Sequence, residues 1–253
     1  MLGYFPNLPY HVVVVGAASG IGRETASFLA AQGVSVACID RNPAGAEETA
    51  ANISSRQGKA MAAAADVTDD ASIPRALDAA ELALGPIHGV VNCAGVTGKT
   101  NLKGHEVNLA DFDAVYRINL RGAMVLSKAV LPRMLARNYG RLLHVASIAG
   151  KEGNAAMAAY AATKAGVIGL VKSLGKDYAE TGVTVNALAP AVIRTPMVDA
   201  LPETVVKYMT DKIPMKRCGE LEEAAQMIAW IVSPACSFTT GFTFDLSGGR
   251  ATY

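Results

Sequence analysis

Short apolar runs alternate with longer helical patterns along the whole chain. The runs lie near residues 12–15, 34–39, 60–65, 89–92, 141–146, 183–188 and 242–245. They are almost wholly apolar, which is typical of parallel strands that helices cover on both faces. The helical patterns lie near residues 21–32, 44–57, 71–84, 109–137, 158–181 and 221–232. The alternation predicts an α/β fold, a Rossmann-type doubly wound parallel sheet of about seven strands flanked by helices.

One segment interrupts this alternation. Residues 194–219 contain Pro196, Pro202 and Pro214 and stand between a strand and the next helical pattern. An insertion at such a place is where a substrate lid lies. No Pro/Gly/Ser-rich linker, repeat or low-complexity tract divides the chain. We therefore expect residues 1–253 to form a single domain with a substrate lobe around 194–219.

Composition and charge narrow the partners. The chain is 51% hydrophobic and 18% charged, and its net charge is only +1. This excludes disorder and predicts a small-molecule substrate, with neither nucleic acid nor an anionic membrane as a partner. The cysteines and histidines lack metal-ligand spacing, so no metal is expected. Neither a signal-peptide pattern nor an apolar run of about 20 residues is present, which predicts a cytoplasmic protein.

A glycine-rich turn follows the first strand. Residues 16–22, GAASGIG, stand between that strand and the first helical pattern. Such a turn lets backbone N–H groups and a helix N-terminus face a pyrophosphate with no side chains in the way. Its spacing differs from the more common G-x-G-x-x-G, and a plain loop is the alternative interpretation. We favour a dinucleotide site, for which the turn supplies Gly16, Ser19, Gly20, Ile21 and Gly22.

A carboxylate at the end of the second strand bears on the choice of cofactor. Asp40 follows the glycines by about 20 residues, where it can accept hydrogen bonds from the adenosine ribose hydroxyls and repel a 2′-phosphate. It therefore predicts NAD rather than NADP. Two points oppose this. The neighbouring Arg41 partly offsets the repulsion, and an Asp after a strand is often only a turn residue.

Tyr160 and Lys164 stand one helical turn apart, so their phenol and ammonium groups share a helical face. A free phenol has a pKa of about 10, which a nearby cation and an oxidised nicotinamide would lower. Such a tyrosine can take the proton of an alcohol as hydride leaves, and return it during carbonyl reduction. Ser147 is expected to hydrogen-bond the same substrate oxygen, and Asn119 to orient Lys164 or a water. Each residue alone has an ordinary structural explanation; together, at these offsets, they predict catalysis.

At this point the chain strongly resembles the classical short-chain dehydrogenase/reductase family, over essentially its whole length. The resemblance implies that Asn119, Ser147, Tyr160 and Lys164 form the catalytic tetrad, and that Lys164 also binds the nicotinamide ribose. It implies a homotetramer as well. The segments that match are the turn at 16–22, Asp66 and Val67 after the third strand, Asn92 to Gly95 after the fourth, the tetrad positions, and Pro190 to Thr195.

The same resemblance implies a cofactor role for residues outside the tetrad. Asp66 and Val67 would contact the adenine, and Asn92 and Gly95 would lie along the cofactor beneath its ribose. The carboxamide of the nicotinamide would be held by Ile193 and Thr195. Three departures from the family pattern touch these segments without removing a tetrad position: Val15 for Thr, Cys93 for Asn or Ala, and Ala191 for Gly.

The sequence restricts the substrate less than the reaction. The leading hypothesis is an NAD-dependent interconversion of a secondary alcohol and a ketone, on a hydroxylated small acid, sugar acid or polyol. Cations near the expected pocket, Lys99, Lys151 and Arg194, would suit a carboxylate but are also ordinary surface charges. A 3-oxoacyl-(acyl-carrier-protein) reductase is the alternative, against which Asp40 counts, and a non-catalytic NAD-binding regulator is a third reading. Ser147 lies outside a G-x-S-x-G elbow, which disfavours a serine hydrolase.

Overall fold

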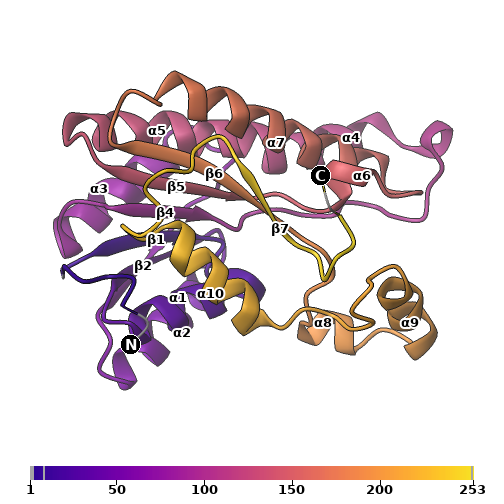
Figure 1. Cartoon of the computed structure of the whole chain (residues 1–253), viewed down its shortest axis with the longest axis horizontal. Helices are drawn as coiled ribbons and strands as arrows, with labels where there is room; N and C mark the ends of the chain where they lie inside the picture. Colours follow the sequence, from indigo (N-terminus) through magenta and orange to yellow (C-terminus); the bar gives the residue numbers. More distant parts are fainter. Residues whose placement is uncertain (1–2, 8, 252) are drawn as a thin grey trace.

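The computed structural model describes residues 3–7, 9–251 and 253. Within them the strands form one seven-stranded, all-parallel sheet in the order β3-β2-β1-β4-β5-β6-β7 (Figure 1). The predicted doubly wound fold is thereby confirmed. The strands are β1 (His11–Val15), β2 (Ser35–Asp40), β3 (Ala60–Ala64), β4 (Gly89–Asn92), β5 (Gly140–Val145), β6 (Val183–Pro190) and β7 (Thr243–Leu246).

Helices fill the connections between successive strands. None of those in the described residues is long and apolar enough to span a membrane. The helices are α1 (Gly20–Ala31), α2 (Pro43–Ser55), α3 (Ser72–Leu84), α4 (Leu109–Tyr116), α5 (Gly122–Ala136), α6 (Ala149–Glu152), α7 (Ala158–Asp177), α8 (Pro196–Asp199), α9 (Glu203–Asp211) and α10 (Leu221–Ile231), with a 3₁₀ turn η1 (Gly104–Glu106) and a π turn η2 (Arg117–Arg121).

The two faces of the sheet carry separate hydrophobic cores. In β1, Val13 and Val15 point into one core and Val12 and Val14 into the other, because successive strand residues face opposite sides. In Figure 1, α5 and α7 cover one face and α1, α2 and α10 the other. Burial on both faces explains why the strands read as continuous apolar runs.

One predicted helical stretch is divided in the structure. The pattern over 109–137 predicts a single helix, but the chain forms α4, then the π turn η2, then α5. The apolar spacing does not distinguish these, since a π turn inserts a residue without interrupting the helical run. The turn has a structural consequence, because it contains the buried side chain of Asn119.

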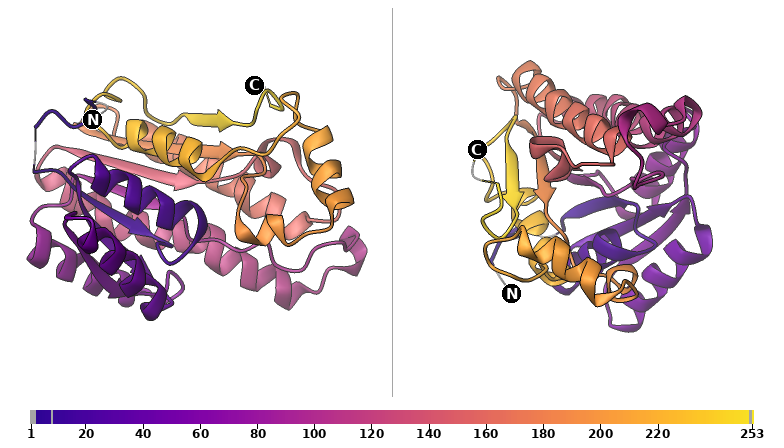
Figure 2. Two further views of the ribbon diagram at one scale, coloured as in Figure 1. Left: turned by 90° about the horizontal axis from the view of Figure 1, so that it is seen from below. Right: turned by 90° about the vertical axis from the view of Figure 1, so that its right-hand side faces the viewer.

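The segment that breaks the alternation forms a small helical excursion. It holds α8 and α9, which lie beyond the carboxyl ends of the strands (Figures 1 and 2). An isolated parallel β-bridge between Ile193 and Gly219 joins the two ends of this segment. The carboxyl ends of β1 and β4 lie side by side because the strand order reverses between them, with Val15 paired to Asn92. In doubly wound sheets this is the place where ligands bind.

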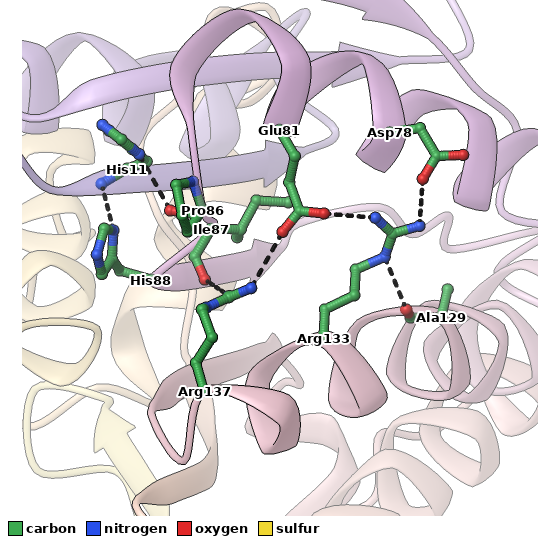
Figure 3. Close-up of polar contacts among 9 residues, drawn as sticks. All are labelled: His11, Asp78, Glu81, Pro86, Ile87, His88, Ala129, Arg133 and Arg137. Carbon is green, nitrogen blue, oxygen red and sulfur yellow. Dashed lines mark hydrogen bonds and ion pairs between the residues drawn. The ribbon is translucent and has the colours of Figure 1, made fainter.

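The amino-terminal end of the sheet carries a polar network of a different kind (Figure 3). Arg133 on α5 contacts Asp78 and Glu81 on α3, each at 2.6 Å, and Arg137 contacts Glu81 at 3.2 Å. Nearby, the His11 backbone N–H donates to Nδ1 of His88 at 3.1 Å. Glu81 therefore joins α3 to Arg133 of α5 and to Arg137, the residue directly after α5.

We expect Glu81→Gln to destabilise the fold modestly, by about 1 kcal/mol, because it weakens two partly buried ion pairs. The matched control is Asp78→Asn, which removes one ion pair of Arg133. The Asp78 side chain in that pair is 67% exposed. Its expected cost is less than half as large. Urea unfolding monitored by circular dichroism measures both. Equal losses for the two variants would contradict the bridging role of Glu81.

Candidate active site

A cavity of about 570 Å³ opens at the carboxyl ends of the strands. All but two of the predicted site residues line it. The exceptions, Asn92 and Asn119, are buried behind its wall. The predicted residues that line it are Gly16, Ser19, Gly20, Ile21, Gly22, Asp40, Arg41, Asp66, Val67, Gly95, Ser147, Tyr160, Lys164, Ile193 and Thr195.

The glycines of the turn serve different purposes. Gly16 and Gly20 have φ of +86° and +51°, a region that side chains disfavour. A Cβ on Gly22 would lie 2.1 Å from the Gly16 carbonyl oxygen, whereas one on Gly20 would have no heavy atom within 4 Å. Gly22 thus allows the first turn of α1 to pack on the end of β1, and Gly20 faces open space. This open, backbone-lined helix N-terminus fits a pyrophosphate.

The Asp40 carboxylate is held in place by two backbone N–H groups. Oδ2 accepts from Ala18 and Oδ1 from Asn42, both at 2.9 Å. Asp40 therefore stabilises the turn after β2, which was the alternative interpretation of this residue. Each oxygen nevertheless keeps a further lone pair, and the carboxylate lines the cavity, so the ribose can still be bound. Arg41 beside it is exposed.

The Asp66 carboxylate is oriented by its own loop. Its Oδ1 accepts from both the backbone N–H and the hydroxyl of Thr68, each at 2.8 Å. Hydrogen bonding, first from the Thr68 backbone, holds the pKa of Asp66 below its usual value. The carboxylate is thus ionised and fixed on the cavity wall, next to the buried Val67.

Tyr160 and Ser147 meet on one wall of the cavity. Ser147 follows β5, and its hydroxyl accepts from the Ala149 N–H at 3.1 Å while lying near enough to the Tyr160 phenol to affect its pKa. Burial raises the pKa of Tyr160, and the neighbouring Ser147 side chain opposes this rise in part. The pKa of Tyr160 predicted from the sequence was a lowered one. This is wrong for the protein without a cofactor, because desolvation of the phenolate outweighs the other influences on the pKa. Tyr160 is a neutral phenol here and suited to donate a proton.

Lys164 is buried beneath the tyrosine. Its Nζ donates to the Val145 carbonyl at 2.7 Å and lies 5.7 Å from the centroid of the Tyr160 ring. Burial lowers the pKa of Lys164 to about 8. The amine still carries its charge for most of the time at neutral pH, so a cation lies beside the Tyr160 ring.

Asn119 braces the cavity wall through the backbone. Its Oδ1 accepts from the Val96 N–H, and its Nδ2 donates to the Val96 carbonyl, both at 2.9 Å, and to the Thr163 hydroxyl at 3.1 Å. The Asn119 amide is therefore hydrogen-bonded to Val96 and Thr163. The sequence had instead predicted that it orients Lys164 or a water. Asn119 and Lys164 both lie next to Gly95. A Cβ on Gly95 would be 3.2 Å from Lys164 Nζ and 3.3 Å from Asn119 Oδ1.

The cations considered as carboxylate ligands each have a partner within the chain. Lys151 pairs with Asp245 at 2.8 Å, Lys99 with Asp111 at 2.8 Å, and Arg194 with Asp199 at 3.6 Å. None of the three lines the cavity. Lys99 and Arg194 are exposed, which agrees with the alternative that they are ordinary surface charges, whereas the Lys151 side chain is only 11% exposed. Across the described part of the chain, no cluster of three or more His, Cys, Asp or Glu side chains is placed to hold a metal.

Sequence reasoning missed some of the polar residues that support the site. Thr163 bonds Asn119, and His144 on β5 bonds both Asn92 and Ser127 of α5. His144 gave no usable signal, since a lone polar residue in an apolar strand has no partner that spacing identifies. Thr163 lies between Tyr160 and Lys164 and had a weak signal from its place in the helix.

Comparison with known proteins agrees with this geometry. Residues 16–251 match a family model described as enoyl-(acyl carrier protein) reductase. The chain is 44% identical over 241 residues to the 2-dehydro-3-deoxy-L-rhamnonate dehydrogenase (NAD(+)) of a Sphingomonas strain, covering 95% of each. It is 34% identical over 237 residues to the 3-oxoacyl-[acyl-carrier-protein] reductase of Thermotoga maritima, covering 94% of this chain and 96% of the other.

A solved structure is similar over nearly the whole fold. A crystal structure of an actinorhodin polyketide ketoreductase variant with NADPH superposes with a TM-score of 0.91 at 31% identity, covering 97% of this chain and 98% of that one. The chain belongs to the short-chain dehydrogenase/reductase family. The predicted family and the predicted oxidoreductase class are both confirmed.

We expect Gly22→Ala and Gly20→Ala to weaken dinucleotide binding alike but to differ in how much stability they lose. The methyl of Gly22→Ala collides with the Gly16 carbonyl, so we expect a loss of stability of about 2 kcal/mol or more together with weakened dinucleotide binding. Gly20→Ala has room but an unfavourable φ, so stability falls by only about 1 kcal/mol while binding falls as strongly. Thermal unfolding and NADH fluorescence titration separate the two. A greater loss of stability in Gly20→Ala would contradict this assignment.

Proposed function

We propose that this protein is an NAD-dependent dehydrogenase that interconverts a secondary alcohol and a ketone on a hydroxylated small acid or sugar acid. The observation that carries the proposal is the meeting of Tyr160, Ser147 and Lys164 on one wall of a cavity whose other end is a glycine turn. The first end supplies proton transfer and the second a pyrophosphate site, which together define hydride-transfer chemistry on a dinucleotide.

The residues of the chain manage the proton. Bound NAD⁺ supplies the acceptor for the hydride. Tyr160 takes the hydroxyl proton of the alcohol as the C–H electron pair leaves and the C=O bond forms, and it returns a proton in the reverse direction. Ser147 holds the substrate oxygen beside the phenol, since both hydroxyls belong to residues that line the same cavity. Lys164 stabilises the phenolate that oxidation requires, which burial otherwise disfavours.

The choice of NAD rests on Asp40. Its carboxylate lines the cavity and is pinned by the backbone of Ala18 and Asn42, so it does not turn away from a 2′-phosphate. The Sphingomonas relative is named as an NAD(+)-dependent enzyme acting on a 2-dehydro-3-deoxy acid, which supports both the cofactor and the substrate class. The remaining cofactor residues predicted from the resemblance, including Ile193 and Thr195, belong to this proposal too.

Three further points are part of the proposal. The segment 194–219 acts as the substrate lobe, because it lies beyond the strand ends and contributes Thr195 and Val198 to the cavity. The assembly is a homotetramer, by resemblance to the family, and the compartment is the cytoplasm, as expected from the sequence. A 3-oxoacyl thioester reductase is the second candidate, favoured by the Thermotoga relative and by the description of the matching family model.

A substrate and cofactor panel tests the proposed function. We expect NAD⁺ reduction with 3-deoxy sugar acids or related hydroxy acids, and activity with NADP⁺ that is at least roughly tenfold lower, because one repulsive contact of about 1.4 kcal/mol suffices for that ratio. Asp40→Asn keeps the side-chain shape but removes the charge, and it is expected to lower the ratio of NAD⁺-dependent to NADP⁺-dependent activity. Faster NADPH-dependent reduction of 3-oxoacyl thioesters would instead establish the second candidate.

Tyr160→Phe tests the acid/base assignment. We expect kcat to fall by about 10²–10⁴-fold, since the variant has no proton to exchange, while NADH affinity and the unfolding temperature change little. Tyr178→Phe is the control, because that tyrosine follows the far end of α7. Steady-state kinetics and NADH titration provide the measurements. Full turnover in Tyr160→Phe would remove the proton-transfer role from this residue.

A further inference from the structure

A continuous chain of buried hydrogen bonds runs from helix α5 to the cavity wall. It begins at Ser127 on α5, passes through His144 on β5 and Asn92 on β4, and ends at the Ala94 backbone. Ser127 and His144 are 0% exposed and Asn92 is 4% exposed. Ser127 and His144 lie outside the cavity lining and have no part in the proton transfer described above.

We propose that His144 and Ser127 are positioning residues, which fix the amide of Asn92 in one orientation and thereby hold the Ala94–Gly95 backbone against the glycine turn and Lys164. This inference rests on the proposed function only in treating that backbone as part of the cofactor-binding wall. The placement of the backbone is itself a property of the chain and is testable without any cofactor.

The direction of every hydrogen bond in the chain follows from its first member. The Ser127 hydroxyl has one proton, which it donates to the Ala123 carbonyl at 2.8 Å. It must then accept from His144 Nε2, which lies 2.9 Å away. The imidazole therefore carries its proton on Nε2 and presents a lone pair at Nδ1.

The orientation of the Asn92 amide follows in turn. Its Nδ2 lies 3.1 Å from His144 Nδ1 and must be the donor. Its Oδ1 then faces the N–H of Ala94, from which it accepts at 3.2 Å. The reverse orientation would oppose two acceptors at His144 and two donors at Ala94. The Ser127 hydroxyl at one end of the chain and the Ala94 N–H at the other therefore require the same orientation of the Asn92 amide.

The imidazole does not disturb this arrangement by gaining a proton. Burial, reinforced by the nearby charge of Lys164, lowers the pKa of His144 to about 3. His144 therefore stays neutral at any pH at which the enzyme is expected to work, and its Nδ1 remains an acceptor.

The backbone held in this way contacts both halves of the site. A Cβ on Gly16 would lie 2.9 Å from the Ala94 nitrogen, so the turn after β4 packs directly on the glycine turn after β1. A Cβ on Gly95 would lie 3.2 Å from Lys164 Nζ. A shift of Ala94 would therefore displace the pyrophosphate-binding turn and the buried lysine together. Because of this close packing, we assign His144 a positioning role in addition to its packing in the core.

Two substitutions of His144 test its two hydrogen bonds separately, because each keeps one bond and removes the other. The amide oxygen of His144→Asn takes the place of Nδ1 and keeps the acceptor for Asn92. The amide nitrogen of His144→Gln takes the place of Nε2 and keeps only the donor to Ser127. We expect the Ala94 amide hydrogen to exchange at near wild-type rate in His144→Asn and about tenfold faster in His144→Gln, the factor expected for loss of one buried hydrogen bond. Hydrogen exchange followed by NMR on the ligand-free protein measures this.

NADH titration adds the functional measurement. We expect the Kd for NADH to rise by roughly tenfold in His144→Gln and to change less than about twofold in His144→Asn. Ser127→Ala should resemble His144→Gln, since it removes the acceptor that fixes the imidazole proton. Ser233→Ala is the matched control: that serine is also 0% exposed and donates to a backbone carbonyl, of Trp230 at 2.8 Å, but lies outside this chain of bonds. Unfolding temperatures are recorded for all four variants.

The outcomes are distinguishable. A purely structural role predicts that Ala94 exchange and NADH affinity follow the unfolding temperature whichever hydrogen bond is kept, and that result would overturn the inference. Equal Ala94 exchange in His144→Asn and His144→Gln would also overturn it, even with NADH binding intact. If the wild-type protein bound no NADH, the proposed function would fail, while the exchange measurement would still decide the positioning role.

Discussion

The contact on which the site depends is the packing of bare backbone between the turns after β1 and β4. Gly22 lies against the Gly16 carbonyl, and Gly16 lies against the backbone of Cys93 and Ala94, at separations that leave no room for a Cβ. These turns meet because the strand order reverses between β1 and β4. A cavity walled by backbone in this way presents N–H groups and a helix N-terminus to an anionic ligand.

Burial then determines the protonation states of the reactive groups. It pushes the pKa of Tyr160 up and the pKa of Lys164 down to about 8, so both side chains are driven toward their neutral forms. Their mutual proximity acts in the opposite direction, since a phenolate and an ammonium stabilise each other. The neutral phenol suits reduction, whereas oxidation depends on the cation beside it. The same pair can therefore serve both directions, with Lys164 mattering more for oxidation.

The sequence was informative wherever the signal was local. Continuous apolar strands and the spacing of the glycines predicted the sheet and the turn, and the offset of Tyr160 from Lys164 predicted that they share a face. What it could not predict depends on tertiary contacts. Asn119 bonds Val96 and Thr163 because a π turn directs it there, and the pKa of Tyr160 follows from burial that no spacing reveals. His144 became interpretable only once its partners on α5 and β4 were known.

The two ends of the sheet are stabilised by different kinds of interaction. At the amino ends, ion pairs such as Arg133 with Glu81 lie partly in solvent, where each contributes little and replacements are tolerated (Figure 3). At the carboxyl ends, polar groups such as His144 and Asn119 are almost fully buried, and each unmade hydrogen bond is costly. Substitutions in these ion pairs should therefore change stability in small steps without reaching the cavity. Substitutions at the second couple stability to ligand binding, because the same hydrogen bonds hold both the core and the wall.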